Sequence, residues 1–206
     1  MIYEQFKSNN ADILIWDITE SADELIGMLS NFECYKTEYE SIKTDKRKIE
    51  FLTARVAINQ LLADEKMIVY DTSGKPFLKD EKTFLSISHS KKWLALIAHP
   101  EHKTGIDIEC PTEKIVQVYK RFLNPTEQKE LYDEENSVKL QLAWSAKEAL
   151  FKIIGDSAVD FAKQLHIFPF ELKDEGYIKA EHLPCKDVYD LYYKVRNNYN
   201  LVYCIA

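Results

Sequence analysis

The segment that most constrains the fold of this chain is a short alternating run, Gly105-Ile106-Asp107-Ile108-Glu109. Successive side chains of a β-strand point to opposite faces, so the alternation predicts a strand whose isoleucines face a core. Asp107 and Glu109 then project together from the other face, with their Cα atoms roughly 7 Å apart. Because two adjacent like charges repel each other, we expect a cation close to this pair.

A helix later in the chain supplies a third carboxylate. Its sequence, Trp144-Ser145-Ala146-Lys147-Glu148-Ala149-Leu150-Phe151-Lys152, lies in a helical pattern that runs from about 137 to 154 and stops at Gly155. Side chains four residues apart share a helix face, so Glu148 and Lys152 lie on one side. Carboxylate oxygens are ligands that Mg²⁺ prefers, and three of them could hold this ion against a phosphate-bearing substrate: Asp107, Glu109 and Glu148.

Composition and charge exclude several classes of protein. The chain has 206 residues, 46% of them hydrophobic, which gives enough apolar material for one large or two small folded domains. Its net charge of −7 argues against general nucleic-acid binding, which usually leaves a basic footprint. No apolar run approaches the roughly 20 residues that span a bilayer, and the first residues lack a signal-peptide pattern. Four cysteines without close pairing are typical of reduced thiols, so we expect a cytoplasmic protein.

The remaining pattern is a mixture of strands and helices. Alternating or continuous apolar runs predict strands over 11–18, 83–88 and 93–99, and short β-like runs within 165–206. Helical spacing and capping residues predict helices over 21–29, 45–62 and 114–122, and another that starts at Asn124-Pro125. The segment 71–76 is rich in turn-forming residues.

Each motif taken alone has an ordinary structural explanation. An Asp-x-Glu strand is most often an exposed face, and Glu148 with Lys152 could be a simple ion pair between helix neighbours. Ser88-His89-Ser90 lacks the glycine elbow of a serine hydrolase, which favours a structural role for His89. Their order along one chain is what carries information.

That order resembles the phosphopantetheinyl transferase superfamily, in its larger, surfactin-synthetase-activating (Sfp-type) branch. The resemblance covers about residues 45 to 152 and rests on five blocks: Arg47 to Arg55, Gly74-Lys75-Pro76, Ser86 to Ser90, Gly105 to Glu109, and Trp144 to Lys152. It implies transfer of the phosphopantetheine arm of coenzyme A to a serine of an apo acyl or peptidyl carrier protein, with release of 3′,5′-ADP.

The resemblance also implies roles for individual residues. Mg²⁺ would be held against the pyrophosphate by Asp107, Glu109 and Glu148, and Lys152 would reach the same pyrophosphate. Coenzyme A would be contacted by Lys75, Ser88 and His89, with Arg47 adding to the pocket for its 3′-phosphate. The general base stays open between two carboxylates, Glu127 and Glu148. Glu127 begins a helix, where the dipole favours its charged form and lowers its basicity, so Glu148 is preferred.

For the fold, the resemblance implies an α/β (α+β) protein of two similar halves about a pseudo-twofold axis, with a monomer expected. The halves would be 1–103, with the coenzyme A-binding helix and the Ser-His-Ser strand, and 104–206, with the metal-binding strand and the motif helix. A faint echo between 52–57 and 144–149 agrees with two halves. Two other functions remain open: a coenzyme A-binding relative without catalysis, and a metal-dependent nuclease.

Overall fold

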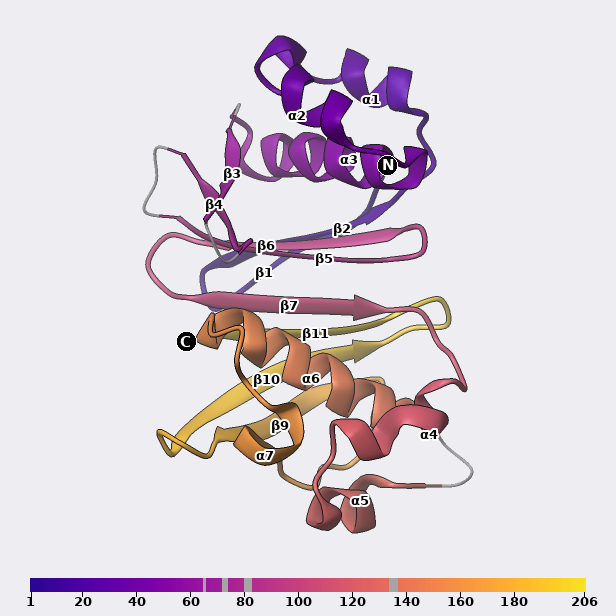
Figure 1. Ribbon diagram of the computed structural model, residues 1–206, viewed down its shortest axis with the longest axis vertical. Helices are drawn as coiled ribbons and strands as arrows, with labels where there is room; N and C mark the ends of the chain where they lie inside the picture. Colours follow the sequence, from indigo (N-terminus) through magenta and orange to yellow (C-terminus); the bar gives the residue numbers. More distant parts are fainter. Residues whose placement is uncertain (65, 72–73, 80–82, 134–136) are drawn as a thin grey trace. The chain divides into compact units, whose positions relative to one another are not determined.

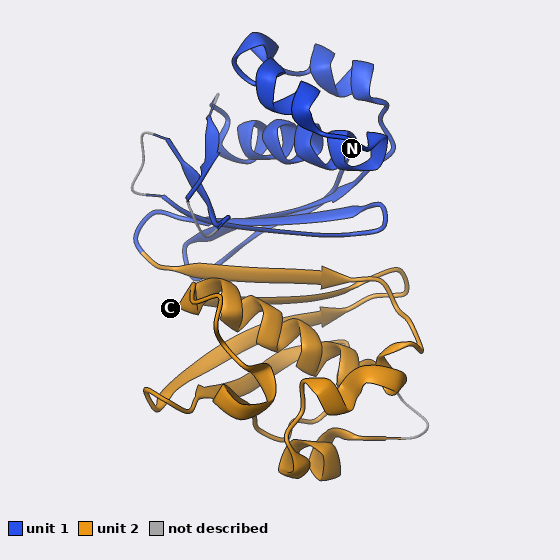
Figure 2. Cartoon of the chain, in the orientation of Figure 1, with its two compact units in different colours: residues 1–101 blue, residues 102–206 orange. Residues whose placement is uncertain are grey.

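The computed structural model describes residues 1–206 except 65, 72–73, 80–82 and 134–136, and has a mixed α+β fold with antiparallel sheets (Figure 1). The chain divides into two compact units, residues 1–101 and 102–206 (Figure 2). The mixed fold class predicted from the sequence is confirmed. The pseudo-twofold relation between the halves stays a prediction, and each unit is described here by itself.

The first unit is a four-stranded antiparallel sheet, ordered β1-β2-β6-β5, with helices packed on it and a small hairpin, β3-β4. Its strands are β1 (Ile2–Ser8), β2 (Ala11–Asp17), β3 (Ile68–Tyr70), β4 (Pro76–Leu78), β5 (Phe84–Ser90) and β6 (Trp93–His99). Its helices are α1 (Ala22–Gly27), the 3₁₀ turn η1 (Phe32–Cys34), α2 (Lys36–Ser41) and α3 (Asp45–Leu62). The long α3 contacts β2 and β6, so its buried face closes the core over the sheet.

The second unit is a five-stranded antiparallel sheet, ordered β7-β11-β10-β9-β8, on which the long helix α6 packs. Its strands are β7 (Thr104–Glu109), β8 (Leu165–Ile167), β9 (Glu175–His182), β10 (Asp187–Val195) and β11 (Asn200–Ile205). Its helices are α4 (Ile115–Val118), the 3₁₀ turn η2 (Tyr119–Arg121), α5 (Pro125–Leu131), α6 (Val138–Ile154) and α7 (Phe161–Gln164). The buried face of α6 is apolar and includes Leu142, Ala146, Ala149, Leu150 and Ile153.

Helix ends follow the capping residues read from the sequence. The Ser21 side chain accepts from the Glu24 amide, and the Glu24 carboxylate accepts from the Ser21 amide, as in a capping box. Asn124 and Glu127 form the same arrangement at the start of α5, with Pro125 in the first turn. Gly155 ends α6 in the left-handed conformation, at φ 71°.

A buried ion pair ties the helices of the second unit together. Lys147 on α6 and Glu127 on α5 both have fully buried side chains, and the ammonium nitrogen lies 2.8 Å from a carboxylate oxygen. The same nitrogen donates to the carbonyls of Phe122, Phe161 and Leu165, at 2.8, 2.9 and 2.8 Å. Burial lowers the pKa of Lys147, and the charge of Glu127 opposes that shift. The lysine therefore links α5, α6 and the chain around α7.

We expect Lys147→Met to destabilise the protein by about 3–5 kcal/mol, because Glu127 would remain as a buried charge without its cation. Three carbonyl groups would also lose a donor. Lys179→Met is a matched control, since its pair with Asp190 is half exposed and should contribute less than about 1 kcal/mol. Urea unfolding measures both. Similar losses for the two variants would contradict this role of Lys147.

The close approach of α6 to β7 depends on Gly105. A Cβ atom at this position would lie 1.9 Å from the backbone oxygen of Ala149, far inside van der Waals contact. Because that obstacle is helix backbone rather than a flexible side chain, any larger residue must push α6 away from β7. The glycine thus sets the separation between the Asp107 strand and the Glu148 helix.

Gly105→Ala should accordingly lower the melting temperature, since overpacked sites typically lose about 1–3 kcal/mol and this contact is severe. Gly27→Ala is the control, because a Cβ atom there meets nothing within 4 Å and alanine favours the helix. Thermal melts of both variants test the point. An equally stable Gly105→Ala protein would show that the two elements separate without cost.

Candidate active site

An acidic group of side chains lies on β7 and α6 in the second unit. Ile106 and Ile108 are fully buried, as the alternation predicted, and Asp107 on the opposite face is only 4% exposed. Glu109 follows on the face of Asp107 and is partly buried. Glu148 on α6 is partly buried as well.

The ionisation of Glu148 shows that these carboxylates act on one another. Burial raises the pKa of Glu148 from 4.5 to about 7, and the negative charge of Asp107 adds to the rise. The charge of Lys152 lowers this pKa, while that of Glu109 raises it further. The site therefore carries more negative charge than its own cation offsets, and it favours binding of another cation.

Lys152 is the cation expected beside the Asp-x-Glu strand. Its ammonium nitrogen donates to the carbonyl oxygen of Ile106 at 2.6 Å and lies 3.3 Å from an oxygen of Asp107. The side chain is 24% exposed, so solvent and small ligands can still reach it. Trp144, four residues before Glu148 on the same helix, packs against Phe122 and Phe161.

The three predicted ligands suit Mg²⁺ by their chemistry. All are carboxylates, and oxygen ligands are what this hard ion selects. Over the residues that the structure describes, however, no three His, Cys, Asp or Glu side chains converge closely enough to hold an ion. The raised pKa of Glu148 still fits a bound cation, because a positive charge there would relieve the repulsion.

Glu127, the other candidate base, is placed differently. Its side chain is fully buried, and its two oxygens accept from Lys147 and from the backbone amides of Asn124 and Ile167. A serine hydroxyl of another protein cannot reach it in this arrangement. The structure therefore gives Glu127 a structural role, and of the two carboxylates only Glu148 stands in the acidic group.

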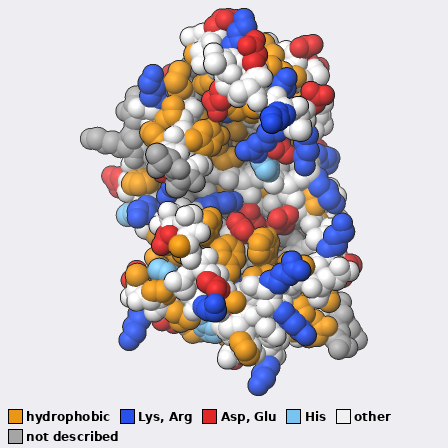
Figure 3. Space-filling view, in the orientation of Figure 1, with side chains coloured by type: hydrophobic (Ala, Val, Ile, Leu, Met, Phe, Trp, Pro, Cys, Tyr) orange, Lys and Arg blue, Asp and Glu red, His pale blue; other side chains and the backbone are white. Residues whose placement is uncertain are grey.

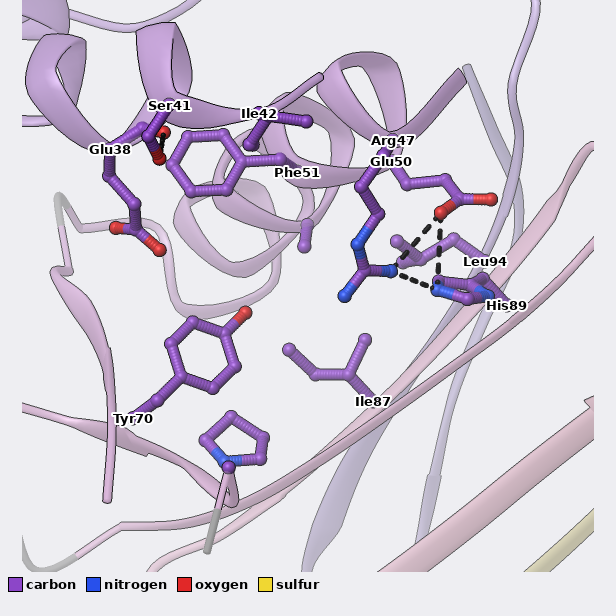
Figure 4. A pocket seen from close by; sticks show the side chains of 13 residues that line it. Glu38, Ser41, Ile42, Arg47, Glu50, Phe51, Tyr70, Ile87, His89 and Leu94 are labelled. Carbon is purple, nitrogen blue, oxygen red and sulfur yellow. Dashed lines mark hydrogen bonds and ion pairs between the residues drawn. The ribbon is translucent and has the colours of Figure 1, made fainter. Parts of the chain in front are cut away.

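A pocket of about 480 Å³ lies in the first unit, between α2, α3 and β5 (Figure 4). Arg47 and His89 line it, and an Arg47 guanidinium nitrogen lies 2.5 Å from the imidazole Nε2. In Figure 3 hydrophobic side chains of this unit lie beside basic ones and a histidine. Arg47 and His89, chosen from separate sequence blocks, are thus brought together.

Glu50 holds this basic pair in place. The carboxylate is almost fully buried and lies 3.1 Å from Arg47 Nη1 and 3.3 Å from His89 Nε2. Lys46 approaches its other oxygen at 3.6 Å. No sequence motif marks Glu50, although it lies one helical turn from Arg47, where a partner is expected.

Lys75 and Ser88 are not brought into the same pocket. Among the described residues, their chain neighbours Gly74, Pro76, Ile87 and His89 line it, but these two side chains do not. Ser88 follows the strand alternation and faces the opposite side of the sheet from His89. The turn predicted at 71–76 is described only in part, because Thr72 and Ser73 lie outside the described residues.

No helix in the described part of the chain is long and apolar enough to cross a membrane. This agrees with the absence of a long apolar run in the sequence.

The profile of the 4′-phosphopantetheinyl transferase superfamily matches residues 103–204, which fall within the second unit. A 4′-phosphopantetheinyl transferase of Bacillus subtilis is 30% identical over 141 residues, 65% of this chain and 60% of its own length. The chain thus spans less than two thirds of that relative.

Two further relatives match. The 4′-phosphopantetheinyl transferase Sfp of Bacillus subtilis (strain 168) is 30% identical over 168 residues, 76% of this chain and 71% of its own length. The 4′-phosphopantetheinyl transferase AcpT of Salmonella typhimurium is 29% identical over 118 residues, 54% of this chain and 62% of its own length. Together with the profile match, they show that the chain belongs to the 4′-phosphopantetheinyl transferase superfamily, a family of transferase enzymes.

Proposed function

We propose that the protein transfers the 4′-phosphopantetheine arm of coenzyme A to a serine of an apo acyl or peptidyl carrier protein, with Mg²⁺ bound and 3′,5′-ADP released. The observation that carries the proposal is the acidic group of β7 and α6, in which the pKa of Glu148 is raised to about 7. A protein that only bound coenzyme A would gain nothing from clustering carboxylates near a polyanion. Family membership supports the same reaction.

The reaction breaks the phosphoanhydride bond of the coenzyme A pyrophosphate and forms a phosphoester with the serine. The serine oxygen forms a bond to the phosphorus that carries the pantetheine, the bond from that phosphorus to 3′,5′-ADP breaks, and the serine proton leaves. Such a step needs neutralisation of charge on the phosphate oxygens and an aligned nucleophile. Mg²⁺, when bound by Asp107, Glu109 and Glu148, supplies part of that neutralisation.

Lys152 and Glu148 have distinct roles in this proposal. Lys152, now beside Asp107, supplies a second positive charge to the pyrophosphate as negative charge moves to the departing 3′,5′-ADP. Glu148 accepts the serine proton, directly or through a water. Glu127 takes no part, because its buried oxygens serve Lys147 and the backbone.

In the first unit, the pocket formed by Arg47 and His89 takes the 3′-phosphate of coenzyme A. Hydrogen bonds from charged donors to phosphate are stronger than neutral ones, and both side chains are already held by Glu50. Lys75 and Ser88 lie next to the lining residues along the chain and are proposed to contact coenzyme A outside this pocket.

The four cysteines are all free thiols, which fits a reducing compartment such as the cytoplasm. We propose that location for the enzyme. The monomeric state expected from the sequence stays a prediction.

To test transfer, an apo carrier protein is mixed with coenzyme A, Mg²⁺ and the enzyme. Mass spectrometry then measures whether the carrier has gained the mass of the phosphopantetheine arm. Asp107→Ala should fold and lose transfer, because a charge that faces the pyrophosphate and its cation is removed. Asp190→Ala, which removes an exposed carboxylate of β10, should transfer like the wild type. Near wild-type transfer by folded Asp107→Ala protein would contradict the role of the acidic group, and activity on nucleic acid instead would favour a nuclease.

The raised pKa of Glu148 predicts how stability changes with pH. The folded carboxyl keeps its proton up to about pH 7, whereas the unfolded chain loses it near 4.5, so this group makes the wild type less stable as pH rises through that window. Glu148→Gln lacks the ionisation. Its melting temperature relative to wild type should therefore be higher at pH 8 than at pH 5.

The melts are made in a chelator and then in Mg²⁺, which should stabilise the wild type at pH 8 more than Glu148→Gln. Glu130→Gln, at an exposed position of α5, is the control and should follow the wild type throughout. If the melting temperatures of Glu148→Gln and wild type change with pH in parallel, the pKa of Glu148 is not raised and this prediction is wrong.

A further inference from the structure

The pocket of the first unit has two chemically different ends. Figure 4 shows Arg47 and His89 on one side and Glu38 and Tyr70 on the other, with Phe51 and Ile87 between them. The first end offers positive charge and hydrogen-bond donors, held by the buried carboxylate of Glu50, and the other offers the half-exposed carboxylate of Glu38. A ligand that fills the pocket must carry an anionic group at one end and a hydrogen-bond donor at the other.

Glu38 is held at its end of the pocket by a buried cation. Its carboxylate oxygen lies 3.1 Å from Nη2 of Arg55, whose side chain is fully buried, while the Glu38 side chain is half exposed. Arg55 is fixed in turn, because its other terminal nitrogen donates to the Phe51 carbonyl at 3.0 Å. Its guanidinium carbon also lies 3.2 Å from the centroid of the Phe51 ring.

The middle of the pocket suits a flat ring. Phe51 and Ile87 line it, and the lining of the pocket also includes Pro76, Tyr70 and Ala54. These surfaces are apolar or aromatic, and they bind a heterocyclic base through stacking and dispersion rather than through charge. The volume is also that of an ordinary small-molecule site, which is roughly 300–1,000 Å³.

We propose that Glu38 recognises the exocyclic amino group of the adenine of coenzyme A and so determines selectivity for the base. This inference rests on the proposed function, because it needs the 3′-phosphate at Arg47 and His89. An ionised carboxylate can only accept hydrogen bonds, and the 6-amino group of adenine is a donor. Arg55 is the positioning residue that keeps the Glu38 oxygen in place.

The charge of Glu38 also explains what this end of the pocket excludes. A carboxylate repels a phosphate, so the phosphate-bearing end of the nucleotide cannot bind in the reverse direction. A base with a carbonyl oxygen at the 6-position would place that oxygen against the Glu38 carboxylate. Both groups are hydrogen-bond acceptors, so no proton would lie between them. The acidic end therefore discriminates against wrong ligands as well as favouring adenine.

The test compares coenzyme A with an analogue whose 6-amino group is replaced by hydrogen. Dissociation constants are measured by titration calorimetry for wild type, Glu38→Ala, Glu38→Gln and the control Glu40→Ala, which alters an exposed carboxylate of α2 that does not line the pocket. Wild type and Glu40→Ala should bind the analogue about ten-fold or more weaker than coenzyme A. Glu38→Ala should bind the two within about two-fold of each other.

Glu38→Gln keeps an oxygen for Arg55, so this variant still tests the proposal if Glu38→Ala does not fold. Its ratio of dissociation constants, analogue to coenzyme A, should fall between those of the wild type and Glu38→Ala. A wild-type ratio in either folded Glu38 variant would overturn the assignment. Dephospho-coenzyme A separates this outcome from failure of the proposed function. If the wild type does not bind coenzyme A, or binds dephospho-coenzyme A equally well, the phosphate pocket itself is wrong. If the wild type binds coenzyme A more tightly than dephospho-coenzyme A but the Glu38 variants keep the wild-type ratio for the analogue, the phosphate pocket stands and only the role of Glu38 is wrong.

Discussion

Burial of the Glu148 carboxyl group near other carboxylates is the constraint that shapes the acidic group of the second unit. The strand alternation places Asp107 and Glu109 on one face. Gly105 allows α6 to approach β7 closely, and the charges of Asp107 and Glu109 then raise the pKa of Glu148. Lys152 offsets part of that charge through its contact with Asp107. An arrangement that keeps excess negative charge partly buried lowers the stability of the ligand-free protein, and for this reason we propose that a cation binds there during function.

Two buried cations support the long helices of the two units in a similar way. Arg55 on α3 and Lys147 on α6 are both fully buried, each pairs with a carboxylate, and each donates to backbone carbonyls. They occupy equivalent positions in the faint echo between 52–57 and 144–149. Each cation fixes a carboxylate that lies outside its own helix. The pair of Lys147 with Glu127 supports the fold alone. For the pair of Arg55 with Glu38, we infer that the arginine also positions Glu38 to bind a ligand.

The sequence predicted the elements with clear periodicity and missed those that depend on tertiary contacts. The helix over 45–62, the strand around Asp107 and the caps at Ser21 and Asn124 follow from local patterns, and the structure has them. Strand β1 was missed because its residues are mostly exposed and polar at the edge of a sheet. Lys147 lies on the core face, four residues from Ala143 and three from Leu150, although a lysine does not by itself predict a buried position. Its carboxylate partner is 20 residues away, a distance that no local pattern reveals.

The most direct test of the account is the pKa of Glu148, measured by carbon NMR on protein labelled at its glutamate carboxyl groups and assigned with Glu148→Gln. Without divalent ions the titration should give a pKa of about 7, and Mg²⁺ should shift it to lower pH because the added charge favours the ionised form. A pKa near the ordinary 4.5 that does not respond to Mg²⁺ would contradict the claim that these carboxylates form one cation-binding site.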